Sequence, residues 1–193
     1  MSYRYSILED ESRLVEIHSL THDCLVDAGR ITPMDSGMFI LYPKLNDIEE
    51  TTVLIVEYEG RIIGTNTITL DDKHGLHSDV HFPDQTDKAR KCSKRLCSSW
   101  RIMIDKTHAS ITVLMGLIEF TLEVGRQLGV DACCFVFRKS HALIYQRLLG
   151  LEIRGSKQYM LDASASNSEE MVFMFASFQT IEEHLMKRKK PSK

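Results

Sequence analysis

The chain has 193 residues, 43% of them hydrophobic, with 24 Lys plus Arg against 27 Asp plus Glu. This length lets one domain bury a core without a metal or disulfide framework, and the net charge of −3 excludes a protein that is basic throughout. No run approaches the roughly 18 apolar residues of a membrane span, and the charged N-terminal stretch lacks the apolar core of a signal peptide. The five cysteines are an odd number and include the adjacent pair Cys133 and Cys134, so we expect reduced thiols and a cytoplasmic protein.

The first fifty residues predict a strand, a helix and a covering loop. Residues 3–8 alternate like a strand, and residues 9–28 carry apolar side chains at three- and four-residue steps, which predicts a helix that ends at Gly29. Residues 30–50 mix proline and glycine with scattered apolar side chains. We expect this segment to be an ordered, lid-like loop.

A hairpin and a polar excursion are expected next. Residues 52–58 and 61–70 are rich in β-branched residues and are joined by Glu59-Gly60, which predicts a tight turn. Gly64 within the second run indicates a bulge or a close approach of another group. Residues 71–94 are polar and predict a long excursion from the sheet.

The second half of the chain predicts one strand–helix–strand crossover. Leu96–Ile104 is strand-like, residues 111–128 have the pattern of a helix, and residues 132–137 are typical of a strand covered on both faces. A crossover makes its two strands parallel, so we expect an α/β (α+β) fold with a mixed, mostly antiparallel sheet. The remaining expected elements are a helix at 141–149, strands at 151–161 and 171–178, and a helix at 180–187.

These elements predict a single domain spanning residues 1–193. Residues 1–50 are expected to form the N-terminal helix and lid-like loop, residues 51–178 the sheet core, and residues 179–193 a C-terminal helix and basic tail. We interpret the basic run at 187–190 as a solvated end of the chain and expect no nucleic-acid partner.

The sequence from residue 116 to residue 155 resembles a known family. It reads G-L-I-E-F-T-L-E-V-G-R-Q-L-G-V-D, then A-C-C-F-V-F, then S-H-A-L-I-Y-Q-R-L-L-G-L-E-I-R-G. This pattern is similar to the helix, strand, helix and closing strand of the GNAT acyltransferases, a superfamily named for its N-acetyltransferases, and the resemblance extends over residues 52–178. It implies the GNAT-like fold, with a splayed central strand pair and flanking helices, and an enzyme that uses an acyl thioester.

One departure narrows the resemblance to a branch of that superfamily. Acetyl-coenzyme A enzymes carry an R/Q-x-x-G-x-G/A loop before the helix, whereas this chain has no glycine between Gly75 and Gly116. Acyl-homoserine-lactone (autoinducer) synthases and N-acyl amino acid synthases lack that loop, and the run S-W-R-I-M-I-D-K at 99–106 is similar to their S-R-F-x-V-D-K stretch. Ser98 and the Asn66-Thr67 pair fit the lactone synthases less well. The chain therefore looks most like an N-acyl amino acid synthase.

The resemblance implies the donor and its binding residues. The donor would be the 4′-phosphopantetheine thioester of acyl carrier protein, or acyl-coenzyme A, with no resident cofactor. Lys106, Ala109 and Ser110 precede a helix whose free N–H groups suit a phosphate, and they are the candidate pantetheine-binding residues. Basic docking residues for the acidic carrier protein, unless they are only a solvated charged face, are Lys88, Arg90, Lys91, Lys94 and Arg95, or Arg138 and Lys139.

The reaction itself suggests catalytic candidates. Attack of an amine on a thioester needs a base, an oxyanion donor and an acid for the leaving thiolate. The resemblance implies an oxyanion donor in the backbone near Met103, on the splayed strand, and an acid at Tyr145, where the wider family often places it, unless that ring is only packed in the core. For the base, Glu57, Glu59 and His108 are alternatives to a water relay.

Arg101 and Trp100 are the candidates for substrate binding beside the splay. Arg101 can bind the acceptor carboxylate or form a structural salt bridge, and Trp100 can line a pocket or lie in the core. Apolar residues that can line a tunnel for the acyl chain, or simply fill the core, are Phe135, Phe137, Met103, Met38 and Phe39. The three histidines at 74, 77 and 81 lie in a polar loop, and we expect no metal there.

The function expected from this reading is transfer of a medium- or long-chain acyl group from acyl carrier protein to the α-amine of an amino acid. The resemblance suggests an aromatic acceptor such as tyrosine. The alternatives are an acyl-homoserine-lactone synthase, an acetyl-coenzyme A dependent N-acetyltransferase, and a catalytically silent domain that binds acyl carrier protein or a lipid.

Overall fold

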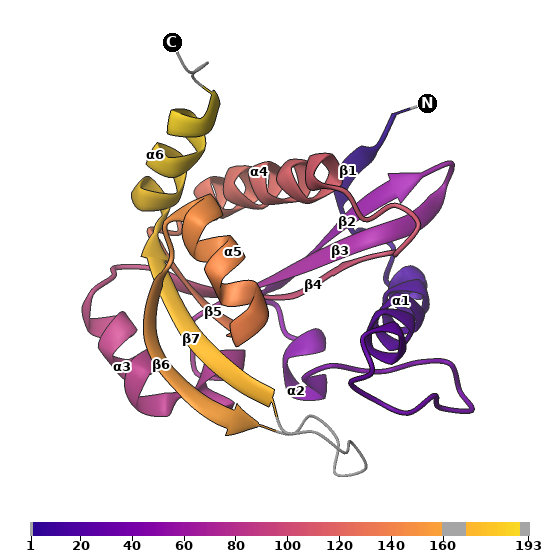
Figure 1. Ribbon diagram of the computed structural model, residues 1–193, viewed down its shortest axis with the longest axis horizontal. Helices are drawn as coiled ribbons and strands as arrows, with labels where there is room; N and C mark the ends of the chain where they lie inside the picture. The colour runs from indigo at the N-terminus through magenta and orange to yellow at the C-terminus, as the bar shows by residue number, and fades with distance from the viewer. Residues whose placement is uncertain (1, 160–168, 190–193) are drawn as a thin grey trace. The chain divides into compact units, whose positions relative to one another are not determined.

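The computed structural model describes residues 2–159 and 169–189, which form two compact units (Figure 1). Among these residues, the first unit holds 2–69 and 99–125, and the second unit holds 70–98, 126–159 and 169–189. Residues 190–193, which include the last residue of the basic run, lie outside the described residues, as do residues 160–168, where a strand end and a loop were expected. No helix in the described part of the chain is both long enough and apolar enough to cross a bilayer.

Seven strands form a sheet with the order β1-β2-β3-β4-β5-β7-β6. The described β4–β5 ladder is parallel, and the β1–β2, β2–β3, β5–β7 and β6–β7 ladders are antiparallel. This confirms the expected mixed, mostly antiparallel sheet. The strands are β1 Arg4–Ile7, β2 Thr51–Tyr58, β3 Arg61–Leu70, β4 Leu96–Ile104, β5 Ala132–Arg138, β6 Glu152–Tyr159 and β7 Glu169–Ser177.

Six α-helices accompany these strands in the described residues. They are α1 Leu14–Asp27, α2 Pro43–Asn46, α3 Pro83–Lys91, α4 Ile111–Gln127, α5 Lys139–Leu149 and α6 Phe178–Lys189. Short 3₁₀ helices at Glu11–Arg13 and His77–Val80 precede α1 and α3. Four of the α-helices were predicted to within a few residues, whereas α2 and α3 lie in segments expected to be loop.

Helix α3 gives a weak signal in the sequence because it buries little apolar surface. Thr86 and Ala89 are its buried residues. Arg90 in its last turn instead bonds Asp71, Asp79 and Asp87, each at 2.6–2.8 Å. Charge pairing therefore fixes this helix to the segment before it, and a hydrophobic pattern cannot reveal such a helix.

In the first unit, β2 and β3 form the predicted hairpin. Both turn residues have positive φ, 52° at Glu59 and 80° at Gly60, as a two-residue turn that follows the strand twist requires. The prediction of a close approach at Gly64 is confirmed, because a Cβ there would lie 3.2 Å from a methyl group of Val56 and 3.4 Å from the carbonyl oxygen of Met103.

The two faces of this hairpin carry different helices (Figure 1). On one face, Ile17 and Leu20 of α1 pack with Val53 and Ile55. On the opposite face, the Asn66 amide donates to Thr121 of α4 at 2.9 Å. Because Thr67 pairs with Val53, its side chain lies on the α1 face.

In the second unit, β5, β7 and β6 form a continuous antiparallel set. Residues 132–138 of β5 pair along their whole length with Met171 to Ser177 of β7. One face of this set joins the core cluster of Leu76, Phe82, Leu96, Cys134, Phe173 and Phe175. Helix α5 ends at Gly150, which has a φ of 69°.

Candidate active site

The candidate site of the first unit begins where β4 stops pairing with β5. The β4–β5 ladder covers three residue pairs and ends at Ser98 and Cys134, just before residues 100–104, for which the family resemblance implied a splayed strand. Three residues further along β4, Arg101 has a φ of 58°, in the left-handed region that residues with a Cβ rarely adopt. The strand therefore departs from regular alternation at this point.

This backbone conformation turns two consecutive side chains to the same face. Trp100 Nε1 donates to Thr69 Oγ1 at 2.9 Å, and the Arg101 guanidinium donates to Thr67 Oγ1 from Nε at 3.0 Å and from NH2 at 2.8 Å. Thr67 and Thr69 are two residues apart on β3 and share a face. In a regular strand, Trp100 and Arg101 would point to opposite faces.

The guanidinium of Arg101 is buried and fixed. The residue is 3% exposed, NH1 donates to Asn46 Oδ1 at 2.6 Å, and the Arg101 Cζ lies 4.8 Å from the centroid of the Trp100 ring. With the two bonds to Thr67, three of its five N–H groups have acceptors. In the described part of the chain, one N–H on each terminal nitrogen remains for another acceptor.

The buried charge of Arg101 has no anionic partner among the residues that the structure describes. No described carboxylate lies within ion-pair distance of it, so the structural salt bridge considered from the sequence has no partner among these residues. Burial lowers the pKa of Arg101 to about 10, which still leaves it charged at neutral pH. A buried cation held by neutral groups makes Arg101 a candidate for binding an anion such as a carboxylate.

The loop after α1 supplies the other wall of this site. Tyr42 meets the Trp100 ring edge-on, with centroids 5.4 Å apart. Asn46 Nδ2 donates to the carbonyls of Leu41 at 2.8 Å and of Tyr42 at 3.1 Å, which orients its Oδ1 toward Arg101. These hydrogen bonds join the end of this loop to β4.

A cavity of about 500 Å³ reaches this wall. Asn46 and Asp47 line it together with Leu14 of α1 and Val53 of β2. Met38 and Phe39 lie half-buried in the same loop, and the Phe39 N–H donates to the His18 carbonyl at 3.1 Å. The loop is thus bonded to α1 as well as to β4.

The opposite face of the same strands is also fixed by polar contacts. Ser99 Oγ donates to Asn66 Oδ1 at 2.9 Å, and Asn66 Nδ2 donates to Thr121 of α4. The polar residues 65–67 and 69 of β3 are thus buried and hydrogen-bonded. They bond β4 at Ser99, Trp100 and Arg101, from both faces of the strand pair.

The three candidate bases belong to the first unit, but none of them is among the hydrogen-bond partners of Arg101. The Glu57 carboxylate is bound by Arg13 at 2.8 Å and approached by Arg4 at 3.6 Å. The His108 ring is tilted by 48° against the Tyr58 ring, with centroids 4.9 Å apart, and lies edge-on to Tyr3 at 6.0 Å. Glu59 is the exposed first residue of the hairpin turn. Their roles stay predictions.

The candidate pantetheine-binding loop precedes α4. The Thr107 N–H and hydroxyl both donate to Asp105 Oδ1, at 2.8 and 2.6 Å, which closes a tight turn. Ser110 Oγ accepts the N–H of Val113 at 3.3 Å and so caps the helix. Ala109 and Lys106 are exposed, and the Lys106 ammonium lies 3.9 Å from Asp27.

Three predicted site residues belong to the second unit and form an aromatic stack. Phe135 and Phe137 lie two residues apart on one face of β5, with ring centroids 5.5 Å apart. The centroid of the Phe137 ring lies 4.2 Å from that of Tyr145 of α5. Tyr145 is buried, and burial raises its pKa to about 12, so it stays protonated at neutral pH. Both expected roles, core packing and proton donor, are compatible with this position.

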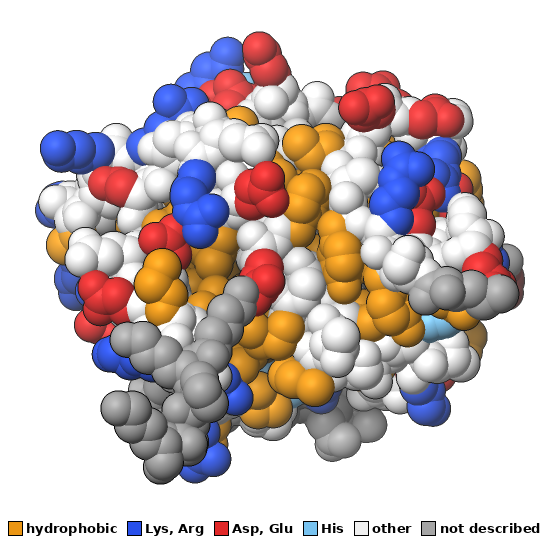
Figure 2. Space-filling view, turned by 90° about the horizontal axis from the view of Figure 1, so that it is seen from above, with side chains coloured by type: hydrophobic (Ala, Val, Ile, Leu, Met, Phe, Trp, Pro, Cys, Tyr) orange, Lys and Arg blue, Asp and Glu red, His pale blue; other side chains and the backbone are white. Residues whose placement is uncertain are grey.

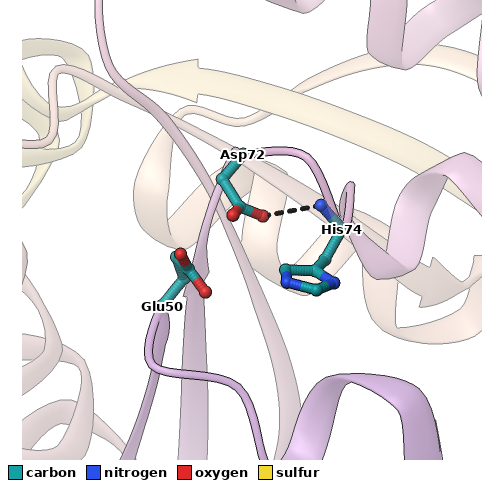
Figure 3. Close-up of side chains that lie close together, drawn as sticks. All are labelled: Glu50, Asp72 and His74. Atoms are coloured by element: carbon teal, nitrogen blue, oxygen red, sulfur yellow. Dashed lines mark hydrogen bonds between the residues drawn. The ribbon is translucent and has the colours of Figure 1, made fainter.

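The histidines of the polar segment lie in different environments. The backbone N–H of exposed His74 donates to Asp72 at 2.8 Å (Figure 3). His77 is 2% exposed and His81 is 8% exposed. The latter two are parts of the second unit's interior.

Sequence reasoning missed two partners of Arg101, Asn46 and Thr67. Asn46 stood in a segment without periodicity, and nothing in the sequence relates it to β4. Threonines at 65, 67 and 69 occupy alternate positions of a predicted strand, which is a signal for a polar, buried face.

Strand order, helices and crossover together define an acyltransferase fold of the GNAT type. The solved structure of FeeM, an N-acyl amino acid synthase from uncultured soil microbes, matches with a TM-score of 0.78 and 16% identity over 96% of each chain. The acyl-homoserine-lactone synthase LasI matches with a TM-score of 0.69 and 12% identity, over 96% of this chain and 95% of that one. YncA, a putative acetyltransferase from Salmonella typhimurium solved with its cofactor acetyl-CoA, matches with a TM-score of 0.61 and 10% identity, over 92% and 95%.

The family model of the N-acyl amino acid synthase FeeM matches residues 16–166. The chain therefore belongs to the FeeM family of N-acyl amino acid synthases and is an acyltransferase. No curated protein matches it.

Proposed function

We propose that this protein transfers a medium- or long-chain acyl group from acyl carrier protein to the α-amine of an amino acid. The observation that carries the proposal is Arg101, a buried cation without a described anionic partner beside an aromatic pair. Its two remaining N–H groups, one on each terminal nitrogen, suit the two oxygens of a carboxylate.

The surroundings of Arg101 favour an amino acid with an aromatic side chain. The rings of Trp100 and Tyr42 meet beside the guanidinium and offer a flat apolar surface with polar groups at its edge. Tyrosine, which the resemblance suggested, has a ring and a hydroxyl that suit such a wall.

The reaction consumes a thioester and an ammonium group. The ammonium loses a proton, and the nitrogen lone pair forms the C–N bond at the carbonyl carbon. The C–S bond breaks, sulfur leaves with the bonding electrons, and it takes up a proton as a thiol. One proton is released overall, and the products are an N-acyl amino acid and the pantetheine thiol.

Two groups are proposed to assist that step. A backbone N–H near Met103, in the irregular part of β4, would stabilise the oxyanion. Tyr145, protonated at neutral pH, would give a proton to the departing sulfur.

The donor is proposed to bind through its pantetheine arm at the capped start of α4. Lys106 is available to a phosphate, while Ala109 and Ser110 leave room for the arm. The proposed lining of the acyl chain is Phe135, Phe137, Met103, Met38 and Phe39. With acyl carrier protein as donor, the reaction belongs in the cytoplasm.

An acidic carrier protein would dock on a cluster of basic side chains. On the face drawn in Figure 2, charges of both signs are mixed, so such a cluster must be local. Arg90 is held by three aspartates and Lys139 by Glu170 at 2.7 Å, so these two candidates are engaged. The remaining exposed candidates at the end of α3 are Lys88, Lys91, Lys94 and Arg95. We propose that they contact the acidic carrier protein.

The acceptor part of the proposal is tested by comparing tyrosine with tyramine, which lacks only the carboxylate. With a medium-chain acyl–acyl carrier protein as donor, we expect the wild type to acylate tyrosine at least tenfold more efficiently. An Arg101→Met variant should lose about 10- to 100-fold in kcat/KM for tyrosine, the size of a charged hydrogen-bonded pair. Its kcat/KM for tyramine should stay within a few-fold of the wild-type value.

The control is Arg126→Met, which removes an exposed arginine paired with Glu182. It should leave both acceptors unaffected. Equal use of tyramine and tyrosine by the wild type would show that no carboxylate is recognised, and acetylation from acetyl-coenzyme A alone would favour the acetyltransferase alternative.

A further inference from the structure

His18 is a half-buried histidine near Arg101 and Asp47 of the candidate acceptor site. It lies in α1, the helix packed on the face of the sheet that carries Arg101, and its backbone carbonyl accepts the Phe39 N–H. Its Nδ1 is buried and has no hydrogen-bond partner in the described part of the structure. A buried ring nitrogen without a partner costs free energy, so an unused acceptor at such a place indicates a ligand group.

Two charged groups on other elements act on His18. Arg101 on β4 disfavours its protonation, and Asp47, which follows α2 and lines the cavity, favours it. Burial is the largest influence, and the pKa of His18 is lowered from 6.5. The imidazole is therefore neutral at pH 7 and able to accept a proton.

We propose that His18 is the general base of the acyl transfer, and that its Nδ1 takes a proton from the ammonium group of the acceptor whose carboxylate Arg101 binds. An amino acid bound through Arg101 carries its ammonium one carbon from its carboxylate, next to the groups that surround the guanidinium. Asp47 supplies a carboxylate on the solvent side that attracts the ammonium group. This inference rests on the proposed function.

The proton is accounted for at each stage. His18 Nδ1 takes one proton from the ammonium, which leaves an amine with a lone pair for the thioester carbonyl. After the C–S bond has broken, the imidazolium returns its proton to solvent, and the second proton of the amine balances the one taken up by sulfur. Glu57, by contrast, is already bound to two arginines.

The test is the pH dependence of acyl transfer in a His18→Gln variant, with a medium-chain acyl–acyl carrier protein and tyrosine as substrates. We expect kcat/KM to fall about 100-fold at pH 7, the usual size of a general-base contribution. The loss should shrink toward high pH, because the acceptor amine then loses its proton to water. In the wild type, kcat/KM should fall as the pH is lowered through an apparent pKa below 6.5. The variant should not show this fall.

The matched control is His22→Gln, one turn further along α1. His22 Nε2 accepts the Met34 N–H at 3.0 Å, so its loss disturbs the same loop by a purely structural route. We expect any effect of this variant to be equal at every pH. A His18→Asn variant and thermal melting of all three proteins check that folding is retained.

The outcomes are separable. Wild-type rates in the His18 variants at pH 7, or a loss that is the same at all pH values, would overturn the role of His18. No N-acyl tyrosine from the wild type at any pH would instead overturn the proposed function.

Discussion

Arg101 combines two features that each oppose folding. Its left-handed backbone costs about 1–2 kcal/mol for a residue with a Cβ, and its charge is taken out of water without a described counter-ion. Bonds to Thr67 and Asn46 and the Trp100 ring offset part of this cost. Strain of this kind persists where surrounding contacts fix it, and it is concentrated at functional sites.

The sequence could place Arg101 on a strand beside the splay, and the resemblance could give it a role. It could not show the positive φ, because Arg has no preference for that region and the conformation follows from tertiary contacts. His18 was overlooked for a related reason: as one polar residue in an amphipathic helix, it gives no signal before the neighbours of α1 are known.

His77 makes the free energy of unfolding depend on pH. It is 2% exposed, and burial, with a smaller effect of His81, lowers its pKa to about 3. An unfolded histidine titrates near about 6.5, so between these values the unfolded chain binds more protons, and stability is lost as pH falls. We expect this residue to reduce the free energy of unfolding by about 1 kcal/mol per pH unit below pH 6.

Urea unfolding between pH 7 and pH 5 measures this slope, and a His77→Gln variant should flatten it. The control is His74→Gln, which changes an exposed histidine of the same segment and should keep the wild-type slope. An unchanged slope in the His77 variant would show that another group is responsible.

At the scale of elements, the sequence predicted those that bury an apolar face or end in a characteristic turn. It did not predict an element that is held by ion pairs. The hairpin, α4 and β5 were predicted because their apolar periods or turn residues are local signals. Helix α3 was missed because the bonds of Arg90 to Asp71 and Asp79 fix it. The end of the β4–β5 ladder was expected only through the family resemblance.

The contact of β1 with α4 yields a prediction for stability. A Cβ on Gly116 would overlap the Tyr5 ring and its hydroxyl, so the helix approaches β1 only because glycine is there. Gly116→Ala should destabilise the protein by about 1–3 kcal/mol through overpacking, although alanine alone favours a helix.

Denaturant unfolding measures this change, with exposed Glu123→Ala in the same helix as a near-neutral control. Combining Gly116→Ala with Tyr5→Ala should cost less than the sum of the two single changes, because removing the ring removes the overlap. A stabilised Gly116→Ala protein would contradict this packing.

At the scale of the whole molecule, the net charge is −3, although the end of α3 carries exposed basic residues. If the end of α3 docks acyl carrier protein, the double change Lys88→Glu and Lys91→Glu should raise KM for acyl–acyl carrier protein about tenfold at low salt. KM for the same acyl group on free pantetheine should be unchanged.

The comparison variant reverses Lys187 and Arg188 of α6, which are also exposed and basic. It alters net charge equally, so it should leave both KM values near those of the wild type. Equal effects of the two double variants would mean that overall charge, and not docking at α3, governs the donor.

The central claim is that the protein joins a fatty acyl group to an amino acid. The most direct measurement is mass spectrometry of organic extracts from a bacterium that expresses the chain and supplies its own acyl carrier protein, compared with an empty-vector strain. We expect new masses equal to a fatty acid plus an amino acid minus water, with tyrosine among the acceptors. The absence of such masses from cells that hold the folded protein would contradict the account.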